Sequence, residues 1–218
     1  MITMKQISRA VVIAAAAATA HVAAYAATPT TVAVNASSLT SLGTVTTTKL
    51  GNATFAAGAS NTGTLTLTPS SVSAALADYA DADGFKISVS SLFLGTNSVS
   101  FSNFSQDLSS GMLSGSLVGA GGILGALNYS GELIDAATIT TTAGAAGTSN
   151  IAFTNFTMAP ALAAYLTAAG ATPSSVPVGS MITNITVTGV PAVPEPSTYA
   201  MLLLGLGGIA VAARRKAA

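Results

Sequence analysis

The stretch Thr62-Gly63-Thr64-Leu65-Thr66-Leu67-Thr68 decides the fold class of this chain, because its threonines and leucines alternate. Successive side chains of an extended strand point to opposite faces, so the leucines share one face and the threonines the other. The same alternation occurs in residues 85–90 (FKISVS) and 99–102 (VSFS). Threonine suits the solvent face, since its β-branched side chain fits a pleated surface. These segments predict strands with one buried face and one solvated face.

Further strand candidates contain β-branched or aliphatic residues and lie between clusters of Gly, Asn and Ser, which are turn-forming residues. They are residues 43–50, 112–118, 127–133, 137–142, 151–158 and 182–188. Many short strands of this kind predict an all-β body, with an antiparallel β-sandwich or jelly roll as the favoured architecture. A parallel β-solenoid is the alternative, although the chain shows no convincing fixed-period repeat.

Two segments predict short helices that pack over an open end or face of the sandwich. Residues 71–79 (SVSAALADY) place their larger apolar side chains at helical spacing. Residues 160–169 (PALAAYLTAA) are rich in alanine and are followed by Gly170, a residue that commonly ends helices.

The N-terminus has the layout of a secretory signal peptide. Lys5 and Arg9 form a positive region, and an apolar run of signal-peptide length follows at residues 10–20. Ala24 and Ala26 fit the small-x-small cleavage rule, which predicts a signal peptide of residues 1–26. The body is therefore expected to be exported, with Sec-type export machinery as a partner.

The C-terminus carries a second set of signals: Val193-Pro194-Glu195-Pro196, an uncharged apolar run at residues 199–213, and Arg214-Arg215-Lys216. Crossing about 30 Å of hydrocarbon takes roughly 20 helical residues, so this run lies near the lower limit for a transmembrane helix. The basic triplet is expected to remain cytoplasmic by the positive-inside rule.

These signals predict five segments along the chain. They are a signal peptide (1–26), a β-sandwich body (27–189), a proline linker with the motif (190–198), a transmembrane helix (199–213) and a basic cytoplasmic tail (214–218). An ordinary C-terminal membrane anchor that follows a proline-rich linker is the alternative to a sorting signal.

The order of motif, apolar run and basic end closely resembles the PEP-CTERM sorting domain of exopolysaccharide-producing Gram-negative bacteria. The resemblance covers residues 193–216 only. It implies that Pro194, Glu195 and Pro196 are recognised by exosortase, a membrane cysteine peptidase that removes the hydrophobic segment. It also implies a location in the inner membrane before processing, and then in the periplasm, at the cell surface or in the extracellular matrix.

The charge of the body excludes one class of partner. Residues 27–192 contain two lysines, Lys49 and Lys86, and six acidic residues, which gives a net charge of −4. Two lysines cannot neutralise the phosphates on which nucleic-acid binding depends. Nucleic acid is therefore not an expected partner of this protein.

The composition of the body also argues against an enzyme. It contains no cysteine, and the one histidine of the chain, His21, lies in the signal peptide. Nucleophilic catalysis therefore lacks its usual bases, and no disulfide can form. Glu132 and Asp135 are three residues apart on a strand, so they are expected to face opposite sides rather than to form a catalytic carboxylate pair.

One acidic cluster, Asp78, Asp81 and Asp83 before Gly84, is a candidate calcium site. Calcium takes six to eight oxygen ligands, and closely spaced aspartates before a glycine turn can supply several. The cluster lacks the full EF-hand pattern, so a solvated turn that leads into the next strand is the favoured interpretation. No other cofactor is expected.

The sequence predicts a non-enzymatic structural role for an exported, exosortase-sorted protein of the cell surface or the exopolysaccharide and biofilm matrix. The alternative is a carbohydrate-binding or adhesive module, either dependent on calcium or independent of it. Most phenylalanines of the body fall on the apolar side of their strands and are expected in the core rather than on a sugar-binding surface.

Overall fold

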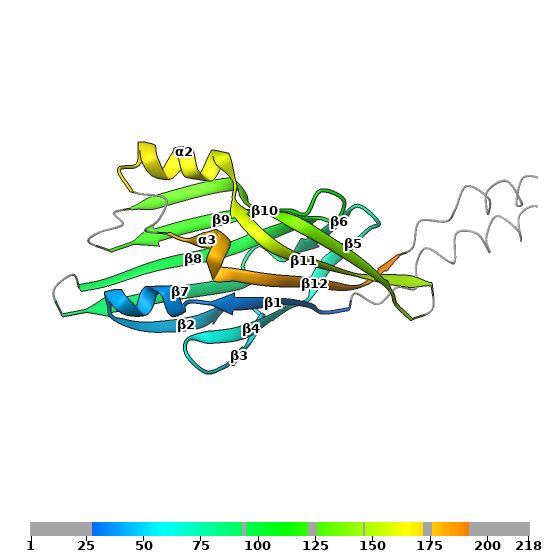
Figure 1. Cartoon of the computed structure of the whole chain (residues 1–218), viewed down its shortest axis with the longest axis horizontal. Helices are drawn as coiled ribbons and strands as arrows, with labels where there is room; N and C mark the ends of the chain where they lie inside the picture. The colour runs from blue at the N-terminus through cyan, green and yellow to red at the C-terminus, as the bar shows by residue number, and fades with distance from the viewer. Residues whose placement is uncertain (1–27, 93–94, 122–125, 146, 172–175, 192–218) are drawn as a thin grey trace, which may run out of the picture. The chain divides into compact units, whose positions relative to one another are not determined.

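The alternating segments form one antiparallel sheet in the computed structural model, which describes residues 28–92, 95–121, 126–145, 147–171 and 176–191 (Figure 1). Its twelve strands are β1 (Thr30–Asn35), β2 (Thr44–Leu50), β3 (Thr54–Ala57), β4 (Thr62–Leu67), β5 (Pro69–Val72), β6 (Leu76–Tyr79), β7 (Gly84–Ser91), β8 (Gly95–Asp107), β9 (Met112–Ala120), β10 (Leu127–Ala143), β11 (Thr148–Met158) and β12 (Ile182–Pro191). All strand pairs within these described ranges are antiparallel. The all-β prediction is confirmed, and the parallel solenoid is wrong. The predicted signal peptide (1–26) and transmembrane helix (199–213) lie outside the described residues.

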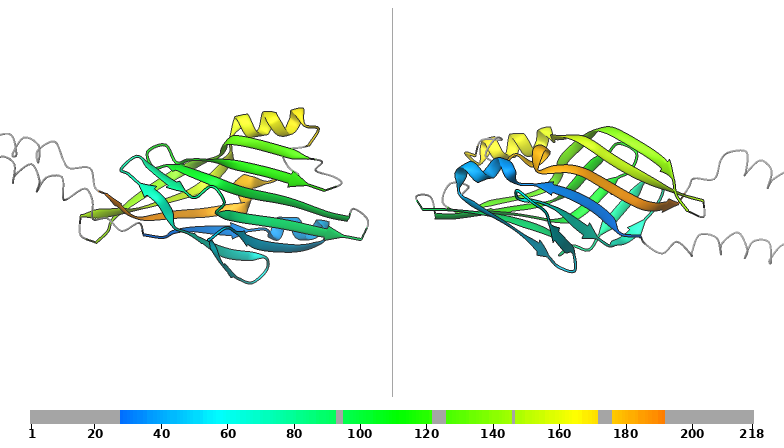
Figure 2. Two further views of the ribbon diagram at one scale, coloured as in Figure 1. Left: turned by 180° about the vertical axis from the view of Figure 1, so that it is seen from behind. Right: turned by 60° about the horizontal axis from the view of Figure 1, so that its bottom comes forward.

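The sheet curls on itself. Its strand order is β2-β7-β8-β9-β10-β11-β12-β1-β4-β3, and β6 pairs with both β8 and β5 beside this path. The two edge strands, β2 and β3, are consecutive in the sequence and are joined by only Gly51, Asn52 and Ala53. The first and last strands of the sheet therefore meet at this connection, and Figure 2 shows the resulting curvature from two further directions. Inward side chains from opposite strands form the core across the interior.

The register of β10, β11, β12, β1, β4 and β3 carries the sequence alternation across six strands. One row of directly paired residues is apolar: Ile139, Phe153, Ile185, Val32, Leu65 and Phe55. The neighbouring row is mostly threonine: Thr140, Ala152, Thr186, Thr31, Thr66 and Thr54. Phe153 and Leu65 are fully buried, whereas the threonines of the second row are half-buried or exposed. Directly paired residues lie on the same face, so the first row lies on the inner face, with its two end residues, Ile139 and Phe55, only partly covered, and the second row faces solvent.

Aromatic side chains fill the interior beneath β7 and β8. The ring centroid of Phe85 lies 4.9 Å from that of Phe101 and 6.3 Å from that of Phe104. All three are buried, as the sequence predicted. Gly84 allows β7 and β8 to approach closely, because a Cβ atom there would lie 1.9 Å from the carbonyl oxygen of Phe101.

Three short helices occur among the described residues: the 3₁₀ helix η1 (Ser37–Leu42), α2 (Pro160–Ala168) and α3 (Val178–Met181). The helix predicted at residues 160–169 is therefore confirmed. It ends in a Schellman motif, in which Gly170 has a φ of +78° and the N–H groups of Gly170 and Ala171 donate to the carbonyls of Thr167 and Leu166. No helix in the described ranges has both the length and the apolar character that spanning a membrane requires.

Helix α2 covers an edge of β10. The first half of β10 pairs with β9 only, since β11 pairs with β10 from Ile134 onward. The backbone N–H of Asn128 donates to the Tyr165 hydroxyl of α2 at 2.7 Å, and the N–H of Ala159 donates to the Leu133 carbonyl at 3.1 Å. These contacts bind backbone groups that would otherwise form an open sheet edge.

The helix predicted at residues 71–79 is wrong. These residues lie in the hairpin of β5 and β6, whose turn is held by the Ser73 hydroxyl, which accepts hydrogen bonds from the N–H groups of Ala75 and Leu76. Ala77 and Tyr79 are buried, whereas Leu76 is 39% exposed. Over so short a segment the apolar residues fit a period of two as well as a helical period, and pairing with β8 favours the strand.

Candidate functional site

The last strand of the body ends at Pro191, directly before the segment that contains the predicted sorting motif. Val190 is buried and pairs with Ser149, and Pro191 pairs with Thr148. Both residues belong to the predicted proline linker (190–198), but they form the end of β12. β12 lies inside the sheet, between β11 and β1.

The chain enters and leaves the body at the same end of two neighbouring strands. The Thr28 hydroxyl donates to the Thr188 carbonyl, and the Thr188 hydroxyl donates to the Pro29 carbonyl at 3.0 Å. Gly189 has a φ of +68°, and a Cβ atom there would lie 2.3 Å from the Thr28 hydroxyl oxygen. A glycine at position 189 therefore lets the residues before β1 lie against the end of β12.

The residues of the two predicted targeting signals lie outside the described part of the chain. They are Ala24 and Ala26 at the predicted signal-peptide cleavage site, Val193, Pro194, Glu195 and Pro196 of the motif, and Arg214, Arg215 and Lys216 of the basic end. What the structure describes is the body to which these signals are attached.

The structure does not bring the three aspartates of the candidate calcium site together. Asp78 accepts hydrogen bonds from the hydroxyls of Ser105, at 2.7 Å, and Ser71, at 3.2 Å. Asp81 is exposed in the turn after β6. Within the described ranges, no group of three or more Asp, Glu, His or Cys side chains is arranged to hold a metal ion.

Asp83 instead holds the connection between the two edge strands. It is only 4% exposed, and its Oδ1 accepts the backbone N–H of Asn52 at 2.7 Å. The preceding Gly51 has a φ of +59°, and a Cβ atom there would lie 2.3 Å from the same oxygen. Asp83 therefore fixes the tight turn at which β2 and β3 meet. The aspartates cluster in the sequence, but the hairpin turns direct them to different neighbours.

A β-bulge changes the position of the second carboxylate pair. The register between β10 and β9 shifts between Glu132 and Ile134, and both Leu133 and Ile134 are fully buried. Two consecutive inward residues place Glu132 and Asp135 on the same outer face, so the expectation that they face opposite sides is wrong. A bulge cannot be read from alternation, because it interrupts that alternation.

Two tyrosines lie beside this bulge, between β10 and α2. The ring centroids of Tyr129 and Tyr165 are 5.1 Å apart, and both side chains are half-buried. The Tyr129 hydroxyl donates to the Glu132 carbonyl at 3.0 Å. Burial, together with the nearby negative charge of Glu132, raises the pKa of Tyr129. The pair joins α2 to the sheet, and its hydroxyls are engaged by the protein itself.

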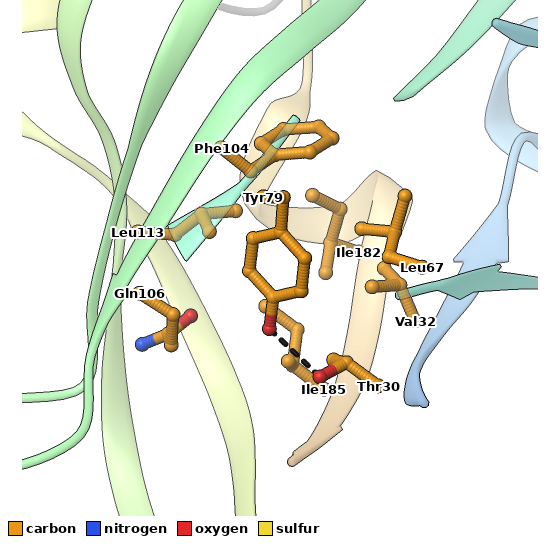
Figure 3. Close-up of a pocket in the computed structure, with 9 residues that line it drawn as sticks. All are labelled: Thr30, Val32, Leu67, Tyr79, Phe104, Gln106, Leu113, Ile182 and Ile185. Carbon is orange, nitrogen blue, oxygen red and sulfur yellow. Dashed lines mark hydrogen bonds between the residues drawn. The ribbon is translucent and has the colours of Figure 1, made fainter. Parts of the chain in front are cut away.

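The interior of the curled sheet contains a small cavity of about 10 Å³ (Figure 3). Its lining is apolar apart from three buried polar side chains, Thr30 of β1, Tyr79 of β6 and Gln106 of β8. The Tyr79 hydroxyl donates to the Thr30 hydroxyl at 2.8 Å. Burial raises the pKa of Tyr79 to about 12, so its phenol remains a donor at neutral pH. No contiguous motif marks this group in the sequence, because its members come from three separate strands.

Comparison with known proteins adds one finding. Residues 192–216 match the family model of the PEP-CTERM protein-sorting motif. The comparisons with curated proteins and with solved structures found no match. The motif implies an exported substrate that is processed by exosortase, and it begins at the residue after the last strand.

Proposed function

We propose that this protein is exported, is processed by exosortase at its C-terminal tail, and then serves as a non-enzymatic structural component of the cell surface or the exopolysaccharide matrix. The observation that carries the proposal is the PEP-CTERM motif at residues 192–216. That motif concerns sorting only. The structural role proposed for the body is supported by the side chains of the body itself.

The position of the motif supports processing. All twelve strands of the sheet end at or before Pro191, and the motif begins at residue 192. Cleavage at any position after Pro191 therefore leaves every strand and the whole core in the released body. β12 pairs on both sides, so a body attached through its C-terminus is held by a central strand rather than by an edge strand.

The chemistry of the body supports a structural role. Asp78 accepts hydrogen bonds from Ser71 and Ser105 on the two strands beside β6, Asp83 holds the connection between β2 and β3, and Asp107 holds the turn before β9. The interior polar group of Thr30, Tyr79 and Gln106 is buried away from any substrate. The body contains no histidine or cysteine, which are the usual bases and nucleophiles.

Mass spectrometry of the mature C-terminus tests the processing step. In cells that contain exosortase, we expect the mature protein to lack Arg214, Arg215 and Lys216, and in cells without the enzyme we expect it to retain them. Glu195→Ala is expected to preserve the tail in both strains, whereas Glu132→Ala, which changes an exposed glutamate of the body outside residues 192–216, is the matched control that should be processed normally. A basic end that is retained in both strains by the unchanged protein would rule out processing.

A second measurement tests the destination of the body. The mature protein from culture is incubated with isolated exopolysaccharide, with calcium or with EDTA, and the bound fraction is measured. A structural component is expected to bind the isolated exopolysaccharide to the same extent with calcium and with EDTA. Binding that is lost in EDTA would favour the calcium-dependent adhesive module instead.

A further inference from the structure

The cavity inside the curled sheet contains a hydrogen-bond acceptor that lacks a partner. Gln106 is fully buried, and its Nε2 donates to the carbonyls of Asp107, at 3.0 Å, and Met112, at 3.2 Å. These two bonds fix the orientation of the amide, so Oε1 is the atom that faces the cavity. This oxygen has no hydrogen-bond partner among the residues that the structure describes. Leaving a buried carbonyl oxygen unpaired is costly, and native proteins nearly always supply a donor.

Two hydroxyl groups line the same cavity. Tyr79 gives its hydrogen to Thr30, so the Tyr79 oxygen keeps a lone pair and the Thr30 hydroxyl keeps its own hydrogen. Figure 3 shows that the Gln106 amide and the Tyr79 hydroxyl both project into the space between the strands. The cavity therefore presents two acceptors and one donor to whatever occupies it.

We propose that this cavity binds a single buried water molecule, which donates to Gln106 Oε1 and is held on its other side by the hydroxyls of Tyr79 and Thr30. The size of the site decides between water and a larger ligand. A volume of about 10 Å³ corresponds to roughly one water-sized probe, so no organic ligand fits. Buried waters usually make two to four hydrogen bonds, and these three groups supply that number.

The bound water links strands that are distant in the sheet. Gln106 belongs to β8 and Thr30 belongs to β1, and four strands, β9 to β12, lie between them along the sheet. The apolar side chains around the cavity, such as Leu67, Phe104 and Ile185, provide contact area but little directional constraint. A satisfied polar network fixes the relative position of the two strands more specifically. This inference goes beyond the proposed function, because it concerns how the sheet closes.

Water-to-protein nuclear Overhauser effects test the proposal directly. The ¹⁵N-labelled full chain is measured in detergent solution, and the side-chain amide protons of Gln106 are observed. We expect a cross-peak from a long-lived water to these protons. If the Gln106 amide signals are resolved and show no such cross-peak, the proposal is overturned.

A cavity-filling variant separates a hydrated cavity from a dry one. Val32→Ile adds one methyl group at the lining and is expected to abolish the cross-peak and to lower the urea midpoint, because Oε1 then has no donor. A dry cavity predicts the opposite result, a raised midpoint. Val118→Ile is the matched control, because Val118 is 47% exposed, and it should change neither quantity.

Thr30→Val provides an independent variant if Val32→Ile does not fold. It keeps the shape of the side chain and removes one hydroxyl, so we expect a weaker cross-peak at Gln106. A cross-peak of unchanged intensity in this variant would contradict the assigned hydrogen bonds.

Discussion

Two regions of the sheet share one core but differ completely in charge. The adjacent strands β11, β12, β1, β4 and β3, which we call the neutral half, contain no charged residue. The described charges of the body lie instead on β2, β6, β7, β8 and β10, which we call the charged half, or in the turn between β6 and β7. Both halves bury the same kind of apolar row, so the charges are not what forms the sheet. Rows of threonine provide the solvent face in the neutral half.

Two turns that lead into the neutral half differ in chemistry from the β8–β9 turn of the charged half. The turns at residues 58–62 and 144–148 each lead into a strand of the neutral half, β4 or β11, and they have the same hydrogen bonds. In each, the hydroxyl of the final threonine (Thr62 or Thr148) donates to the carbonyl of an alanine three residues earlier, at 2.6 and 2.7 Å. In the charged half, the turn between β8 and β9 uses a carboxylate instead, because Asp107 accepts the N–H groups of Ser109 and Ser110. Only the second kind of turn depends on an ionisable group, which makes the comparison testable by mutation and by pH.

The largest expected effect comes from the apolar row that runs from Ile139 of β10 across the strands of the neutral half. Phe153 is fully buried and pairs with Ile139 and Ile185. Phe153→Ala is expected to lower the free energy of unfolding by about 3–5 kcal/mol, because it removes apolar burial and leaves a cavity. The measurement is urea unfolding followed by circular dichroism.

The control for this prediction lies on the opposite face of the same strands. Thr140→Ala, at an exposed position of the outer threonine row, is expected to change stability by less than about 0.5 kcal/mol. Equal losses in the two variants would contradict the assignment of the rows to inner and outer faces.

The sequence predicted the strands in which alternation is long and uninterrupted. β4, β7 and the start of β8 were found because their leucines, phenylalanines and valines alternate with threonine and serine. The prediction failed where pairing decides the structure, as at residues 71–79, and where bulges interrupt the alternation, as at Leu133. It also missed the short strands β1 and β3, and it divided the long strand β10 into two candidates.

The functional residues show the same division. The sorting motif was recognisable because it is a contiguous string of residues, and the family comparison supports it. The interior group of Thr30, Tyr79 and Gln106 spans more than seventy residues of sequence, and only the curled sheet brings it together. Asp83 stands out in the sequence as part of an acidic cluster, but its burial against the Asn52 backbone follows from the meeting of the sheet edges.

The next effect concerns the contact between the two halves through Tyr79. Burial raises the pKa of this phenol from 10.0 to about 12, so the folded state keeps its proton at a pH at which the unfolded state has lost it. The contribution of the protonated Tyr79 phenol to the free energy of unfolding is fully present below the pKa of the phenol in the unfolded state. It is lost as the pH rises through the pKa of the phenol in the folded state. A shift of this size corresponds to roughly 2–3 kcal/mol.

Unfolding measured by urea between pH 9 and 12 tests this contribution. The unchanged protein should lose more stability over this range than Tyr79→Phe, which cannot ionise at that position. Parallel pH curves for the two proteins would contradict the assigned burial of Tyr79.

The smallest expected effect distinguishes the two kinds of turn. Hydrogen bonds from the backbone N–H of Ser110, the hydroxyl of Ser109 and its N–H lower the pKa of Asp107 below its ordinary value of 3.8. The ionised carboxylate therefore stabilises the fold above its unfolded pKa, and this contribution is lost as the pH falls through the folded pKa. Asp107→Ala is expected to cost about 1 kcal/mol at pH 7, since the site is near the surface and partly screened by solvent.

Thr148→Val is the matched variant in the neutral half, because it removes the turn hydroxyl and keeps the shape of the side chain. Its cost is expected to be similar at pH 7 and unchanged at pH 2–3, whereas the cost of Asp107→Ala should shrink over the same range. Urea unfolding at the two pH values measures both differences. If the cost of Thr148→Val falls at acid pH as much as that of Asp107→Ala, then the charged and neutral halves do not differ in the chemistry of their turns, and the distinction between them is one of composition alone.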